Sequence, residues 1–147
     1  MKILLNILVG LFAASTLWSQ EGPPEGGFTT FHVKAEDPYE YIDYLKENPQ
    51  FLAAGGGDIS GYCMTVSGHD YPGEMFIWNG FSSLEDMMAN ATTYNPYAAP
   101  TALKNMREIV YTSFWKTLTP FELTPGVERV TRVSIKPENV VAFFKSS

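Results

Sequence analysis

The sequence predicts an α+β domain in which one antiparallel sheet carries two helices on one of its faces. Two observations lead to this prediction. Strand-like and helix-like segments follow one another in the order strand, helix, strand, strand, helix, strand, and hydrophobic residues make up 45% of the 147 residues. That composition can fill a core, and the length suits one ordinary domain plus a short extra segment, because compact domains cluster at roughly 100–150 residues.

The first strand and the first helix are expected between residues 28 and 48. Residues 28–35 are rich in β-branched and aromatic side chains, which alternate between the two faces of a strand. Asp37-Pro38-Tyr39-Glu40 then places an N-cap, a first-turn proline and a capping-box glutamate in the order that starts a helix. Asn48-Pro49 should end or kink that helix, because the residue before a proline is biased away from helical dihedrals.

A hairpin is expected next, after a glycine-rich link. Gly55-Gly56-Gly57-Asp58 lacks the Gly-Lys-Ser/Thr ending of a phosphate-binding loop and precedes a strand, so it is predicted to be a flexible connection. Residues 59–67 and 74–81 both have strand composition, and turn-forming residues join them at 68–73. The two strands are predicted to pair as antiparallel neighbours.

The second helix and the fourth strand complete the predicted domain. Ser82-Ser83-Leu84-Glu85 has the pattern of a second capping box. The helix should pause at residues 94–97 and restart near Pro100, and residues 111–118 alternate as a fourth strand. The restarted helix has three apolar residues spaced for one buried face, Leu103, Met106 and Val110.

This order of elements is the split βαβ, or ferredoxin-like, arrangement, expected here over residues 28–120. Its two helices cover one face of the sheet, and the other face stays exposed in a monomer. We therefore expect a second sheet to cover that face, either in a homodimer or in an intramolecular pseudo-dimer.

Residues 1–20 have the composition of a signal peptide, and residues 21–27 that of a flexible Pro- and Gly-rich lead. Lys2 gives the positive start, an apolar stretch follows to Ala14, and cleavage is expected either at Ala13-Ala14-Ser15 or near Ser19 and Gln20. The apolar stretch is shorter than the ~20 residues that span a bilayer, so no stable membrane anchor is expected. The predicted location of the mature protein is periplasmic or secreted.

Charge and cysteine content exclude several classes of function. Sixteen acidic residues against ten basic ones give a formal charge of −6 without a basic run, so nucleic acid is not an expected partner. Cys63 is the single cysteine, which excludes an intramolecular disulfide and a cysteine-rich zinc site. No metal site is predicted.

Residues 127–147 resemble the beginning of the domain. Residues 130–145 repeat the pattern of residues 31–46, with Pro137 in the place of Pro38. One interpretation is the start of a second, truncated copy of the domain; the other is a native C-terminal strand and short helix that pack on a single domain.

The chain resembles the dimeric α+β barrel superfamily, which includes antibiotic-biosynthesis-monooxygenase-like domains. The resemblance covers residues 28–118 and depends on the element order, the Phe31-His-Val33 strand, the Asp37-Pro38 helix start and the Met75-Phe-Ile-Trp-Asn79 strand. It implies two sheets paired into a barrel, with a pocket beneath the helices or in the barrel interior. The activities it implies range from cofactor-free oxygenation to haem degradation, isomerisation and ligand binding.

Five residues are candidates for a functional site. His32 is the candidate catalytic residue, as a general base or a haem ligand, and its alternative role is a hydrogen-bonded histidine on a polar strand face. Trp78, Asn79, Tyr62 and Tyr94 are candidates for ligand binding. Trp78 and Asn79 are consecutive on a strand, so only one of them can share a face with His32. No cofactor is predicted, except haem if His32 serves as its ligand.

The sequence thus predicts an exported domain that binds, or oxygenates in the manner of a monooxygenase, a small hydrophobic or aromatic molecule. The alternative is a non-catalytic α+β barrel module that serves self-association. Whether the protein is an enzyme stays open on the sequence alone, because no motif identifies a reaction.

Overall fold

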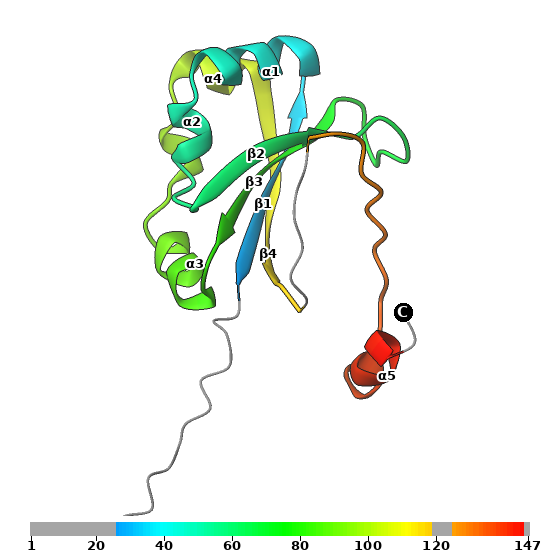
Figure 1. The fold of residues 1–147 in the computed structure, drawn as a ribbon. Helices are drawn as coiled ribbons and strands as arrows, with labels where there is room; N and C mark the ends of the chain where they lie inside the picture. The colour runs from blue at the N-terminus through cyan, green and yellow to red at the C-terminus, as the bar shows by residue number, and fades with distance from the viewer. Residues whose placement is uncertain (1–25, 119–124, 146–147) are drawn as a thin grey trace, which may run out of the picture.

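The computed structural model describes residues 26–118 and 125–145 (Figure 1). A four-stranded antiparallel sheet organises this part of the chain. The strands lie in the order β2-β3-β1-β4, which confirms the predicted ferredoxin-like topology. Their bounds are Gly27–Ala35 for β1, Ile59–Met64 for β2, Glu74–Phe81 for β3 and Arg107–Lys116 for β4.

The helices between β1 and β4 lie on one face of the sheet, as predicted (Figure 1). The first predicted helix ends where Asn48-Pro49 requires, and a short helix follows it. The second is interrupted by a single 3-10 turn before it restarts. The bounds are Pro38–Glu47 for α1, Gln50–Ala53 for α2, Leu84–Ala91 for α3, Pro96–Ala98 for the 3-10 helix η1 and Thr101–Met106 for α4.

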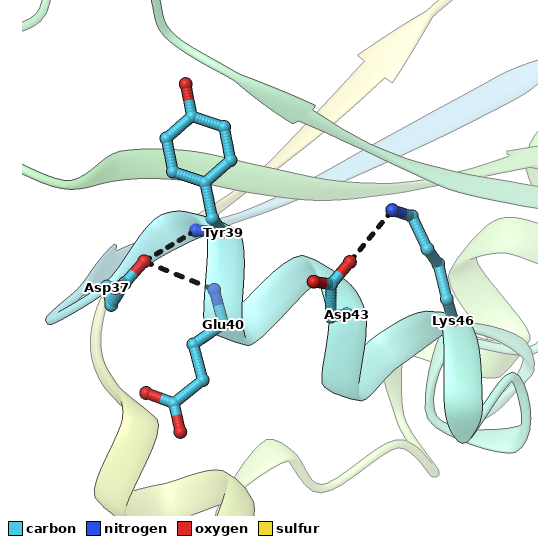
Figure 2. Close-up of polar contacts among 5 residues, drawn as sticks. All are labelled: Asp37, Tyr39, Glu40, Asp43 and Lys46. Carbon is cyan, nitrogen blue, oxygen red and sulfur yellow. Dashed lines mark hydrogen bonds and ion pairs between the residues drawn. The ribbon is translucent and has the colours of Figure 1, made fainter.

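Helix α1 begins with the predicted cap (Figure 2). One carboxylate oxygen of Asp37 accepts hydrogen bonds from the backbone N–H groups of Tyr39 (2.9 Å) and Glu40 (3.2 Å). These bonds satisfy two of the donors that a helix leaves open at its first turn. Lys46 pairs with Asp43 at 2.9 Å on the exposed side of the helix, where such a pair adds little stability.

The N-cap of α3 lies one residue later than the sequence pattern predicted. Ser83, and not Ser82, is the N-cap, and its hydroxyl oxygen accepts from the backbone N–H of Asp86 at 3.0 Å. The same hydroxyl donates to the Asp86 carboxylate at 2.6 Å. The two consecutive serines allow two capping patterns, Ser82 with Glu85 and Ser83 with Asp86. The hydrogen bonds between Ser83 and Asp86 show that the second one forms.

Strand β4 starts four residues earlier than expected, and this corrects the predicted role of Val110. Helix α4 ends at Met106, and Arg107 already pairs with Ala35 of β1. Val110 is therefore a strand residue that is 43% exposed, not part of a buried helical face. It is the extra residue of a bulge, because His32 pairs with Tyr111 while the next residue of β1 pairs with Ile109.

The hydrophobic core lies between the sheet and α1, α2 and α4. Strand residues from β1 and β3 meet helix residues there, and a half-buried shell that includes Tyr62 packs against them. The largest fully buried side chains are Tyr41, Leu45, Met75 and Val33. These side chains pack the helices against one face of the sheet. Side chains on the other face therefore do not belong to this core.

The C-terminal segment, residues 125–145, adds no strand to the sheet among the described residues, but Arg132 Nη2 donates a hydrogen bond to the Tyr111 hydroxyl of β4 at 3.1 Å. The strand expected near residue 130 forms no ladder with another strand among the described residues, whereas the expected helix forms after Pro137, as η2 (Pro137–Asn139) and α5 (Val140–Lys145). Val127 is 92% exposed, and α5 lies away from the helices that cover the sheet (Figure 1). The division of the chain into a domain and a second copy stays a prediction.

The predicted signal peptide and lead fall on residues 1–25, which lie outside the described residues, as do residues 119–124 and 146–147. Within the described ranges, no helix has the length and apolar character to cross a bilayer.

Candidate functional site

The sheet divides the predicted site residues between two faces. Side chains of β1 alternate, so His32 points away from the helices that cover Phe31. On β3, Trp78 pairs with Thr30 and Asn79 pairs with Thr29. Trp78 therefore shares the open face with His32, while Asn79 lies on the helix-covered face. The expectation that only one of the two would accompany His32 is confirmed.

A cavity of about 130 Å³ lies between the sheet and the helices on the covered face. Of the five predicted site residues, only Asn79 and Tyr94 line it. Tyr62 also lies on this face but packs against the core outside the cavity. The remaining lining residues are mostly apolar: Thr29, Phe31, Leu45, Phe51, Leu52, Gly55, Ile77, Asn90, Ala91, Pro96, Arg107, Thr112 and Phe114.

Asn79 places an unsatisfied polar group at this cavity. Its side chain is 5% exposed, and its Oδ1 atom has no hydrogen-bond partner among the described residues. Buried amide oxygens are normally bonded, and leaving one unpaired costs about 1–3 kcal/mol. A ligand with a hydrogen-bond donor would satisfy it.

Two glycines make room for the amides beside the cavity. A Cβ atom on Gly55 would come within 2.3 Å of the Asn79 amide. Gly56 has a φ of +72°, and a Cβ there would come within 1.9 Å of Asn90. The glycine-rich link predicted as a flexible connection thus has a packing role: it brings backbone close to Asn79 and Asn90.

Arg107 brings a positive charge to the cavity. Its guanidinium carbon lies 4.7 Å from the ring centroid of Phe31 and 5.7 Å from that of Tyr41, and Nη1 donates a hydrogen bond to the Tyr41 hydroxyl. Burial raises the pKa of Tyr41, while Arg107 opposes that shift. Within residues 26–118 and 125–145, Arg107 has no carboxylate partner.

The open face carries an aromatic cluster around His32, which is 2% exposed. The His32 ring stacks on Tyr111 with centroids 4.1 Å apart and lies 5.3 Å from Phe76. Its Nε2 atom lies 3.0 Å from the hydroxyl oxygen of Thr30, which also accepts from Nε1 of Trp115 at 3.0 Å. This hydrogen bond agrees with the alternative interpretation of His32 as a hydrogen-bonded strand histidine, and its catalytic role stays a prediction.

Burial, and secondarily the positive charge of Arg132, lowers the pKa of His32 to about 4. The imidazole is thus neutral at pH 7, and its buried Nδ1 has no hydrogen-bond partner among the described residues. The surroundings do not fit an axial haem ligand, because Nε2 is bonded to Thr30 and aromatic rings pack against the imidazole. The described residues also include no group of three or more His, Cys, Asp or Glu placed to hold a metal ion.

Sequence reasoning missed Arg107, Asn90 and Gly55 as cavity residues. Arg107 was assigned to a helix, and only the early start of β4 turns it toward Phe31. Asn90 and Gly55 come from segments 35 residues apart, and no local pattern signals that they meet. The glycine run was the one sequence feature that could have indicated a close approach of backbone to side chains, because Gly56 adopts a positive φ.

Comparisons with known proteins give distant structural likenesses. No family model matches the sequence, and no curated protein matches it. The solved structure of a NIPSNAP family protein from Agrobacterium tumefaciens is 18% identical, with a TM-score of 0.44 over 68% of this chain and 97% of that chain. SnoaB, a cofactor-independent oxygenase from Streptomyces nogalater, is 14% identical, with a TM-score of 0.37 over 69% of this chain and 98% of that chain.

Proposed function

We propose that this chain is a small-molecule-binding domain whose ligand, about the size of one aromatic ring, occupies the cavity between the sheet and the helices. The observation that carries the proposal is the buried Asn79 oxygen, which lines the cavity and has no partner among the described residues. A cavity of about 150 Å³ is known to hold a benzene molecule, so the 130 Å³ here suits a single ring.

The lining supports binding better than catalysis. Among the described residues, the cavity lining includes no histidine, carboxylate or cysteine, and its titratable side chains are those of Tyr94 and Arg107. His32, the candidate base, lies on the other face of the sheet. The monooxygenase-like activity that the resemblance implies therefore gains no support from this arrangement, and measuring oxygen uptake with phenol as substrate would test it directly.

Phenol is a suitable probe, because its ring matches the cavity and its hydroxyl can donate to Asn79. We expect phenol to shift the amide NMR signals of Thr29 and Thr112, which line the cavity from β1 and β4. Replacing Ala91, a lining residue of α3, with Phe should fill the cavity and abolish the shifts. Ala89→Phe is the matched control, because Ala89 is an exposed residue of the same helix outside the lining. Shifts that persist in the Ala91→Phe variant would refute the proposal.

We further propose that the open face pairs with a second sheet, in a homodimer or a pseudo-dimer. Large aromatic side chains on that face support this, since Trp115 is 43% exposed and Tyr111 36% exposed. Light scattering on the purified protein tests it, and a strictly monomeric protein in which no second sheet covers this face would refute it.

Export is the remaining part of the proposed function. The composition of residues 1–20 supports it. N-terminal sequencing of the protein recovered from outside the cytoplasm should begin near residue 16 or residue 21. Recovery only from the cytoplasm, with Met1 retained, would refute it.

A further inference from the structure

The cavity contains a cation whose charge no described residue balances. Arg107 stacks on Phe31 and donates one hydrogen bond to a neutral hydroxyl, that of Tyr41. A guanidinium has five N–H donors in a planar fork, and one bond to Tyr41 leaves the others open. Two parallel N–H groups of that planar fork can bind the two oxygens of a carboxylate, the smallest anionic group that an aromatic ring commonly carries.

Arg107 and the unsatisfied amide of Asn79 lie beside neighbouring residues on the covered face of β1. Thr29 and Phe31 are two residues apart on β1, which separates their rows by about 7 Å at the rise of a strand. Asn79 pairs with Thr29, and the Arg107 guanidinium lies over Phe31. The two polar groups therefore belong to neighbouring rows of the covered face and both line the cavity, so one ligand in the cavity can contact both.

The protein as a whole gives no general attraction for anions. Its formal charge is −6, so long-range electrostatics oppose a negatively charged ligand. A preference for an anion over its neutral analogue would therefore have to come from a local positive group, and Arg107 is the cationic residue in the cavity lining.

We infer that the ligand of this cavity is an aromatic or similarly flat carboxylic acid, whose carboxylate binds Arg107 and whose opposite end donates a hydrogen bond to Asn79. This inference rests on the proposed binding function of the cavity. It names the ligand class: a one-ring acid with a hydroxyl or amino group opposite its carboxylate.

The test compares 4-hydroxybenzoate with 4-hydroxybenzamide, which have the same shape and differ in charge. Calorimetric titration of the full protein at pH 7 and low salt should show at least a tenfold tighter binding of the acid, because charge-assisted bonds are about twice as strong as neutral ones. The Ala91→Phe variant should bind neither compound, which assigns the signal to the cavity.

The decisive variant removes the charge together with the hydroxyl it bonds. Arg107→Met combined with Tyr41→Phe avoids leaving a buried hydroxyl unpaired, so folding should be preserved and amide NMR spectra can confirm it. The preference for the acid over the amide should disappear, because the acid loses its charged partner and weakens by at least tenfold more than the amide does. Arg107→Lys, which keeps the charge but loses the fork, should retain part of the preference. Lys104→Met removes an equal charge from the exposed face of α4 and should change nothing.

The possible results distinguish a failure of the inferred ligand class from a failure of the proposed binding function. If neither compound binds in a manner blocked by Ala91→Phe, the proposed function fails and the inference fails with it. If the amide binds as tightly as the acid, or if the double variant weakens both equally, the inference alone is overturned and the binding function stands.

Discussion

The buried imidazole of His32 should make the protein acid-sensitive in a defined range of pH. Its pKa is lowered from 6.5 to about 4 in the folded state, and burial is the larger cause. Between these two values the unfolded chain binds a proton that the folded chain does not. The stability that His32 contributes is therefore complete above pH 6.5 and is lost as the pH falls toward 4.

The size of the effect follows from the width of that range. The pKa falls by about 2.5 units, and each unit corresponds to about 1.36 kcal/mol, so the loss is about 3 kcal/mol. The groups that face His32 are Thr30, Phe76, Tyr111 and, through its charge, Arg132. None of them is a carboxylate whose charge could compensate the protonated ring.

Urea denaturation between pH 7 and pH 4 measures this loss. Wild type and His32→Gln should diverge in pH dependence, with the variant losing about 3 kcal/mol less over the range, because Gln does not titrate. His69→Gln is the matched control, since His69 is exposed in the hairpin loop, and it should follow wild type. If wild type and His32→Gln show the same dependence on pH, the burial of a neutral imidazole is the wrong description.

Three further changes test the packing described above, each by chemical denaturation. Asp37→Ala removes the acceptor of two bonds at the start of α1 and should lower the free energy of unfolding by about 1 kcal/mol, whereas an unchanged value would contradict the cap. Gly73→Ala should destabilise by more than 1 kcal/mol, because its φ is +73° and its Cβ would clash with the Ala35 carbonyl; an equal or higher stability would contradict this strain. Arg107→Met should destabilise more in the presence of Tyr41 than in Tyr41→Phe, and additive effects would contradict their coupling.

Local sequence signals predicted much of the fold because they depend on near neighbours. The Asp37 cap, the helix end at Asn48-Pro49 and the alternation of β1 all act over a few residues. The start of β4 was misplaced because residues 103–110 fit a helical period as well as a strand. Pairing of Arg107 with Ala35, a contact distant in sequence, decides that choice.

The candidate site was less predictable for the same reason. Period-two alternation correctly separated Trp78 from Asn79. It could not show that the Asn79 oxygen lacks a partner, or that Arg107 lies over Phe31, because both depend on how separate elements pack. Aromatic composition alone pointed equally to both faces of the sheet.

Because the proposed ligand and the proposed partner sheet occupy opposite faces of the sheet, we expect self-association and ligand binding to be independent. Ser113 pairs with Thr30 on the open face, whereas its neighbour Thr112 lines the cavity on the other. Ser113→Glu would place a charge in the proposed sheet–sheet interface without removing any contact described for Ser113. We expect this variant to be monomeric by light scattering and to bind 4-hydroxybenzoate like wild type, while Ala91→Phe should show the reverse. If Ser113→Glu also abolished binding, the cavity would depend on the partner sheet, and the two faces would form one site.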